Sequence, residues 1–245
     1  MQSLSQPQDR LSLLLLPFHA LGFWARNQLT FWIAALPVAV LAAGIAFLQG
    51  SDERWVREPL LAVVYALFLD RWMRIVLLEN APVCEETDTL RRSIANARFL
   101  LFAMAAFGLA FVLQTIPIFD VLVWSLIVSP LLLYLPALSS GQPIGIGAAW
   151  RLGRPVQITV FLTVSTVALL AMVTQDVIDI VELMLPSRVW TAPLLNAAAR
   201  LIDCLMLAVL GHVLVTLYRG LSGWEPPEPE DRPYRSMGRT RRRSS

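Results

Sequence analysis

The sequence predicts an all-α, polytopic membrane protein with six transmembrane helices and additional interfacial amphipathic helices. Apolar residues make up 56% of the 245 residues and only 16% are charged, with a mean hydropathy of +0.61. An average soluble domain has about a quarter of its residues charged. In addition, apolar runs that approach the roughly 20 residues needed to cross a bilayer as a helix recur along the chain. We therefore expect an integral membrane protein.

The net charge and the two cysteines argue against several kinds of partner and site. The net charge is +2 and all twenty basic residues are arginines. They are spread over membrane-flanking segments and a tail, which argues against nucleic acid as a partner. Cys84 lies in a hydrophilic loop and Cys204 in an apolar run, so nothing favours their pairing. We predict no disulfide, no metal site and no cofactor.

Residues 1–30 are expected to form a cytoplasmic segment with an interfacial helix. Over Leu11–Ala25 apolar residues recur at helical spacing, while His19 and Arg26 lie off that stripe. This pattern is typical of a helix that lies in the plane of the membrane surface. The apolar run that opens the segment is short and is followed by Pro17, without a small-residue cleavage site. We therefore do not expect a cleaved signal peptide.

A six-helix transmembrane domain is predicted over residues 31–219. In its first span Ala35, Ala39 and Ala43 line one face at four-residue spacing, which allows a neighbouring helix to approach closely. Only Pro117 and its neighbours separate the third span from the fourth, so these two should form an antiparallel hairpin. The spans are expected at about 31–48, 59–78, 99–116, 118–138, 156–173 and 190–218.

Prolines interrupt the fourth of these spans. Pro130 and Pro136 each lack a backbone N–H and clash with the preceding helical turn. We expect a kink there, with neighbouring helices satisfying the backbone groups that it frees.

Three polar segments between the spans are expected to form surface helices and turns. Residues 79–98 place carboxylates first and arginines last, which favours a short helix starting near Thr87. Residues 139–154 are rich in glycine, but no strand or soluble sheet accompanies them. We therefore expect an interfacial turn and a short helix rather than a phosphate-binding loop. Residues 175–185 carry three carboxylates, for which a solvated helix face is the simpler interpretation and a cation site is the alternative. These are Asp176, Asp179 and Glu182.

The distribution of arginines predicts the orientation. With six spans and the N-terminus inside, fourteen arginines fall in cytoplasmic segments and three fall outside. Arginine-rich loops stay on the cytoplasmic side, so both termini should be cytoplasmic. Cys84 would then face a reducing compartment.

The C-terminal residues 220–245 are predicted to be a disordered cytoplasmic tail. They are rich in Pro and Glu and contain too few apolar residues to form a core. The arginines near the end could contact anionic lipid, at about 1 kcal/mol per charge near the surface, or serve only as a topology signal. They are Arg239, Arg241, Arg242 and Arg243.

Ionisable residues inside the predicted spans are the strongest candidates for a functional site. Asp70, Arg71 and Arg74 lie in the second span, and Arg200 and Asp203 in the sixth. A charge at such depth costs about 2.5 to 3.5 kcal/mol on insertion scales, so the second helix needs partners. Acid and base one turn apart can neutralise each other locally. Because the two spans carry complementary charges at similar depth, we hypothesise cross-pairing of Asp70 with Arg200 and of Asp203 with Arg71 or Arg74.

This charge network has three possible roles. It could be a set of buried polar contacts that fixes the register of the helices, which is the simplest interpretation. Arg71 and Arg74 could instead bind a lipid headgroup or a substrate phosphate. The carboxylates and arginines could also form a path for protons or ions.

Two stretches resemble known membrane proteins. The segment WMRIVLL, residues 72–78, resembles the Trp-His-Arg-Phe-x-Leu-Leu-Gly-Glu stretch of a group of six-span inner-membrane proteins from alphaproteobacteria. Trp72, Arg74, Leu77 and Leu78 match, while Met73 and the pair Glu79-Asn80 depart from it.

The second resemblance concerns the plan of a surface helix that leads into a span. It is found in FWARNQLTFWIAALP, residues 23–37, and in LPALSSGQPIGIGAAWRLGRPVQITVFL, residues 135–162. This plan is similar to the membrane domain attached to glycerophosphodiester phosphodiesterases and to its Yip1-like relatives. The resemblance implies a membrane scaffold without an active site of its own, because no soluble stretch is long enough for the phosphodiesterase domain.

We therefore expect a multi-pass protein of a bacterial inner membrane that is a non-enzymatic scaffold or envelope component. Its expected partners are the lipid bilayer, anionic lipid headgroups and a membrane protein. The alternative is a small transporter or lipid-handling permease that uses the intramembrane Asp and Arg groups. An intramembrane enzyme is disfavoured, because no nucleophile, base and metal set converges in the sequence.

Overall fold

The computed structural model describes residues 15–47, 54–78, 96–106, 109, 123, 127–141, 144–184 and 191–224. Regular structure in these residues is helical, without strands, which confirms the all-α fold class. Three helical segments are long and apolar enough to cross a membrane, namely Gln28–Ile45, Ile146–Ile178 and Pro193–Ser222. They coincide with the first, fifth and sixth predicted spans.

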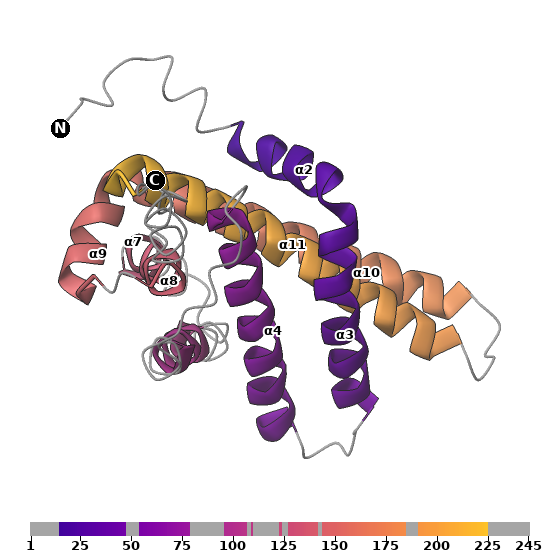
Figure 1. Cartoon of the computed structure of the whole chain (residues 1–245). Helices are drawn as coiled ribbons and strands as arrows, with labels where there is room; N and C mark the ends of the chain where they lie inside the picture. Colours follow the sequence, from indigo (N-terminus) through magenta and orange to yellow (C-terminus); the bar gives the residue numbers. More distant parts are fainter. Residues whose placement is uncertain are drawn as a thin grey trace, which may run out of the picture.

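Helices α2 (Leu16–Arg26) and α3 (Gln28–Phe47) follow each other with one residue between them. Asn27 forms this junction: its backbone N–H and its side-chain Nδ2 both donate to the carbonyl oxygen of Phe23, and its own carbonyl accepts the N–H of Phe31. Figure 1 shows that the chain changes direction between the two helices, and these hydrogen bonds of Asn27 connect them. The first span starts earlier than predicted for this reason.

The alanine face of α3 is buried as the four-residue spacing predicted. Ala35, Ala39 and Ala43 are at most 8% exposed, and α3 packs on α4 (Arg54–Leu77) and α11 (Thr191–Ser222). Phe31 at the beginning of α3 contacts Phe68 in the second half of α4, with ring centroids 6.2 Å apart. At the other end of the pair, Ala42 clusters with residues from the first half of α4. The two helices therefore run antiparallel.

Helix α4 crosses α11, runs in the same overall direction from beginning to end, and is held to it by Trp72. The Trp72 indole Nε1 donates to the carbonyl oxygen of Ala208 over 3.0 Å. Around the same indole lie the rings of Phe23, Phe31 and Phe68, with centroids 5.7–6.4 Å away. Aromatic contacts at this spacing add to the energy of burial. One side chain therefore joins α2, α3, α4 and α11.

Helix α10 (Gln157–Met184) packs along α11, and Figure 1 shows the two side by side, crossing the α3–α4 pair. Residues 185–190 connect the two helices. Because this connection is too short to return along the length of either helix, α10 and α11 run antiparallel. The acidic stretch over residues 175–185, interpreted from the sequence as a solvated helix face, is helical as far as Met184 and continues α10 without a break. No Gly or Pro occurs between Gln157 and Met184 to end the helix.

The predicted third and fourth spans lie only partly within the described residues. A short apolar helix, Asn96–Ala106, covers the beginning of the third. The end of the fourth is broken into α7 (Ser129–Leu131) and α8 (Tyr134–Ser139), each with a proline near its start. The interruption predicted from Pro130 and Pro136 is therefore confirmed. The surface helix predicted near Thr87 falls outside the described residues.

The short helix predicted after Ser139 is α9 (Ile146–Gly153), which leads through the 3₁₀ turn η2 (Arg154–Val156) into α10. Helix α9 ends against α7 at a very close approach. A Cβ atom added to Gly153 would collide with the carbonyl oxygen and Cα of Pro130. Only glycine allows the two backbones to approach so closely.

We expect Gly153→Ala to destabilise the protein by about 1–3 kcal/mol, because the added methyl group must displace the backbone of α7. The matched control is Gly147→Ala in the same helix, since a Cβ there meets nothing within 4 Å. Thermal unfolding of both variants in mild detergent would test this. An equal effect at the two positions would contradict the close contact of α9 with α7.

Candidate functional site

The five intramembrane charges predicted from the sequence do not form one network. They belong to two separate clusters of polar side chains on α4 and its neighbours. The Tyr65 cluster consists of Tyr65, Asn196, Arg200 and Asp203. The Asp70 cluster consists of Asp70, Arg74, Asn96 and Ser139.

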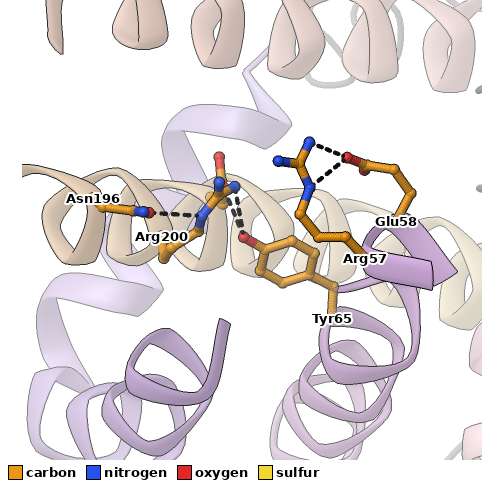
Figure 2. Close-up of polar contacts among 6 residues, drawn as sticks. Arg57, Glu58, Tyr65, Asn196 and Arg200 are labelled. Atoms are coloured by element: carbon orange, nitrogen blue, oxygen red, sulfur yellow. Dashed lines mark hydrogen bonds and ion pairs between the residues drawn. The ribbon is translucent and has the colours of Figure 1, made fainter. Parts of the chain in front are cut away.

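The Tyr65 cluster joins α4 to α11. The Tyr65 hydroxyl donates to Asp203 Oδ2 over 2.7 Å, and Arg200 Nη1 lies 3.1 Å from the same oxygen. Arg200 Nε donates to Asn196 Oδ1 over 3.2 Å. Figure 2 shows the guanidinium of Arg200 between Asn196 and the phenol of Tyr65. The acid, the base and the hydroxyl therefore satisfy one another, with the side chains of Arg200 and Asp203 23% and 29% exposed.

A second ion pair lies beside this cluster in the first turns of α4. Arg57 donates from Nε and Nη2 to Glu58 Oε1 over 3.1 and 2.7 Å. Figure 2 shows this pair near Tyr65. Since both side chains are about one-third exposed, at 29% and 37%, the pair contributes little to stability, as solvent-accessible pairs usually do.

The Asp70 cluster joins α4 to α8 and to the helix Asn96–Ala106. Ser139 Oγ donates to Asp70 Oδ1 over 2.7 Å, and Arg74 Nε lies 3.0 Å from Asp70 Oδ2. Arg74 Nη2 also donates to Asn96 Oδ1. The ion pair is partly shielded from solvent, with Asp70 15% and Arg74 22% exposed. One acid–base pair on α4 thus gathers polar groups from two further helices.

The cross-pairing of Asp70 with Arg200 is wrong, and helix geometry explains why. Tyr65 lies on the face of α4 that packs against α11, where its hydroxyl contacts Asp203 and Arg200. Asp70 follows Tyr65 by five residues, which is about 140° around the helix and about 7.5 Å along it. It therefore faces α8 instead. Each acid pairs with the arginine of its own helix, Asp70 with Arg74 and Asp203 with Arg200.

Arg71 is in neither cluster. It is exposed, and it continues an outward-facing row of α4 that includes the exposed apolar residues Val56, Leu60 and Leu67. Among the described residues no ion pair involves Arg71. The candidate lipid contacts Arg239, Arg241, Arg242 and Arg243 lie outside the described residues.

Four residues of the two clusters were not predicted from the sequence, namely Tyr65, Asn96, Ser139 and Asn196. Tyr65 was counted among the apolar residues of a span, although its hydroxyl is a hydrogen-bond donor. Asn96 and Ser139 lie at the boundaries of predicted spans, where a polar residue is unremarkable. One feature of the sequence could have pointed to these residues. Asp70 and Asp203 lie in predicted spans, and carboxylates at that depth need polar partners, which other helices can supply.

Besides the two clusters, the described part of the bundle contains further hydroxyl, thiol and potential metal-ligating side chains. No group of three His, Cys, Asp or Glu among the described residues could hold a metal ion. The hydroxyls of Thr163, Thr166 and Thr174 donate to carbonyl oxygens four residues earlier in α10, and Cys204 is buried. In both clusters a carboxylate is paired with an arginine of the same helix.

Comparisons of the chain with protein-family models, with curated proteins and with solved structures find no match. The resemblance of residues 72–78 to a group of inner-membrane proteins therefore stays a prediction.

We predict that exchanging the charges within α11, by Arg200→Asp with Asp203→Arg, restores part of the stability lost in Arg200→Asp alone. The single change leaves two carboxylates together and should cost about 1–3 kcal/mol, the usual penalty for an unsatisfied buried group. The cross-helix exchange, Arg200→Asp with Asp70→Arg, should restore none of it, because Asp70 faces α8. Yield and thermal unfolding in mild detergent would be compared; recovery by the cross-helix exchange alone would contradict local pairing.

Proposed function

We propose that the protein is a non-enzymatic membrane scaffold whose intramembrane charges hold its helices together. The observation that carries this proposal is the way in which the two acids, Asp70 and Asp203, are neutralised. Asp70 and Asp203 each pair with an arginine one turn away, and each also accepts a hydroxyl from a neighbouring helix. Polar groups used in this way act as contacts between helices rather than as a site that awaits a ligand.

Energetics support this assignment. A lone charge in a span costs about 2.5 to 3.5 kcal/mol on insertion scales, and local pairing reduces that cost within each helix. The remaining hydrogen-bonding capacity of the carboxylates is then met only when α4 lies against α11 and α8 in one orientation. The two clusters thus fix the rotation of α4 about its axis, which is the property that a scaffold needs.

We further propose six spans with both termini on the cytoplasmic side. Two observations support this topology. Arg219 near the end of α11 donates to the carbonyl oxygen of Leu77 at the end of α4, so these two helices end at the same side of the bundle. Helix α10 runs antiparallel to α11 and therefore begins at that side too. The chain between α4 and α10 must then return to the side from which it left, which is consistent with the two further spans that we propose there.

The exposed apolar surface of α10 fits this placement. Large side chains along the helix are about half exposed or more, including Ile158, Leu162, Leu169 and Val173. At 28 residues α10 is about 42 Å long, whereas the hydrocarbon core of a bilayer is about 30 Å thick. Such a helix crosses a bilayer fully, with its exposed side chains in contact with lipid.

The topology predicts which engineered cysteines react from which side. In a Cys84→Ser background, a cysteine at Ser222, in the last turn of α11, should react only after the membrane is opened. A cysteine at Val56, which is exposed near the beginning of α4, should react in intact cells with a maleimide that does not cross membranes. Cys204 is buried and should stay unlabelled. Labelling of both positions from the same side would contradict the proposed topology.

The scaffold proposal also predicts that the charged residues of the bundle do not conduct protons across the membrane. Proteoliposomes containing the wild-type chain should dissipate an imposed proton gradient no faster than protein-free vesicles, while Asp70→Asn and Asp203→Asn should each lower the unfolding temperature. The structural role predicts the second result, because each change removes an ion pair. A wild-type proton flux that either substitution abolishes would instead favour a permease.

A further inference from the structure

The end of the bundle where α11 stops carries a set of basic side chains that the scaffold role does not use. We define the basic cluster as His19 and Arg26 of α2 together with His212 and Arg219 of α11. Helix α2 packs on α11 through Leu16, Ala20 and Phe23, and the rings of Phe23 and His212 have centroids 4.9 Å apart.

The helical spacing brings the four basic residues together around that ring contact. His19 precedes Phe23 by four residues and Arg26 follows it by three, so both flank the face of α2 that meets α11. Arg219 follows His212 by seven residues, which is two turns along the same face of α11. The charged groups that act electrostatically on the His212 imidazole are His19, Arg219 and Arg26.

Arg26 and Arg219 differ from Arg57, Arg74 and Arg200 in having no acidic partner among the described residues. Arg57, Arg74 and Arg200 are each paired with a carboxylate. Within the described residues, Arg26 instead donates to the carbonyl oxygen of Gly22, and Arg219 to that of Leu77. An arginine has five N–H donors, so most of the donors on both guanidiniums remain available. The fixed positive charges here are the guanidiniums of Arg26 and Arg219, and an anion bound beside them would relieve their mutual repulsion.

Two buried polar atoms in this region also have no partner. His212 Nδ1 and Trp24 Nε1 are buried without a hydrogen bond, whereas most buried polar atoms in proteins are paired. Trp24 follows Phe23, the residue that touches His212. Of the described buried side-chain atoms without a hydrogen bond, His212 Nδ1 lies at the junction of α2 and α11 and Trp24 Nε1 lies on α2, while the remaining one, Arg74 Nε, has the ion pair with Asp70.

Apolar side chains beside the basic cluster point to the kind of anion. On the outer side of α2, Leu15, Phe18 and Leu21 are 45%, 69% and 42% exposed. Arg219 also lies over the ring of Trp224, 5.6 Å from its centroid, and tryptophan is enriched where membranes meet water. A ligand with both a phosphate and acyl chains would match the basic groups and the apolar row together, while a free anion would use only the former.

We propose that the basic cluster binds the phosphate of an anionic phospholipid headgroup, with the acyl chains lying against the outer side of α2. This inference rests on the proposed membrane placement of the helices and adds to it a specific lipid site. It assigns α2 the task of anchoring the scaffold to one kind of lipid at one face of the membrane.

The test uses the full-length protein reconstituted in nanodiscs of phosphatidylcholine with phosphatidylglycerol, followed by native mass spectrometry of the released protein. The variant is His19→Gln with Arg26→Gln, both exposed positions. The control is Arg151→Gln with Arg154→Gln, which are exposed at the same end, on α9 and η2. We expect wild type and control to retain a phosphatidylglycerol molecule and the variant to bind it at least about fivefold more weakly, equivalent to about 1 kcal/mol for one basic residue at an anionic surface.

Three outcomes would overturn the proposal. They are retention of no phosphatidylglycerol by the wild type, an equal loss in the control, which would indicate general surface charge, and displacement of the lipid by inorganic phosphate, which would indicate a site for a free anion. Failure of the membrane placement is distinguishable, because the protein would then not be recovered with the nanodiscs at all.

Discussion

The need to neutralise charges inside apolar helices determines how this bundle is assembled. Asp70 and Asp203 each have an arginine one turn away, so each of these carboxylates is neutralised within its own helix. Neutralisation within a helix leaves the carboxylates with further lone pairs to satisfy, and these accept hydroxyls from Ser139 and Tyr65. The order of these contacts matters: the ion pairs make each helix tolerable in an apolar environment, and the hydroxyls then select its neighbours.

Helix α11 is the element on which the others converge. It packs against α2, α3, α4, α8 and α10, and its small residues allow the approach. A Cβ atom on Gly211 would lie 3.1 Å from a methyl group of Leu69 and 3.4 Å from the Trp72 ring. Small residues at helix interfaces serve in membranes the purpose that apolar burial serves in water, because lipid does not drive helices together. Beside Gly211, the Trp72 indole adds a hydrogen bond and ring contacts.

The two ends of the bundle differ in their electrostatics. Where α4 begins, Arg57 is matched by Glu58 and Arg200 by Asp203. Where α11 ends, His19, Arg26 and Arg219 surround His212 without a described carboxylate beside it. Basic segments of membrane proteins stay on the cytoplasmic side, so the end with unmatched basic groups is the one expected to face the cytoplasm. A scaffold with one such end would sit in the bilayer in a fixed orientation and contact the anionic headgroups of one leaflet.

The sequence by itself determined the helical class, the positions of α3, α10 and α11, the alanine face of α3 and the breaks at Pro130 and Pro136, because hydropathy, small-residue spacing and proline act locally. It also found the ionisable residues of both clusters. Only the tertiary structure decided which of them meet. Tyr65 and Asp70 differ by about 140° around one helix, and no local pattern states which neighbour lies on either side. Partner choice depends on the rotation of packed helices, which the contacts of Trp72 with Ala208 and of Gly153 with Pro130 fix from distant parts of the chain.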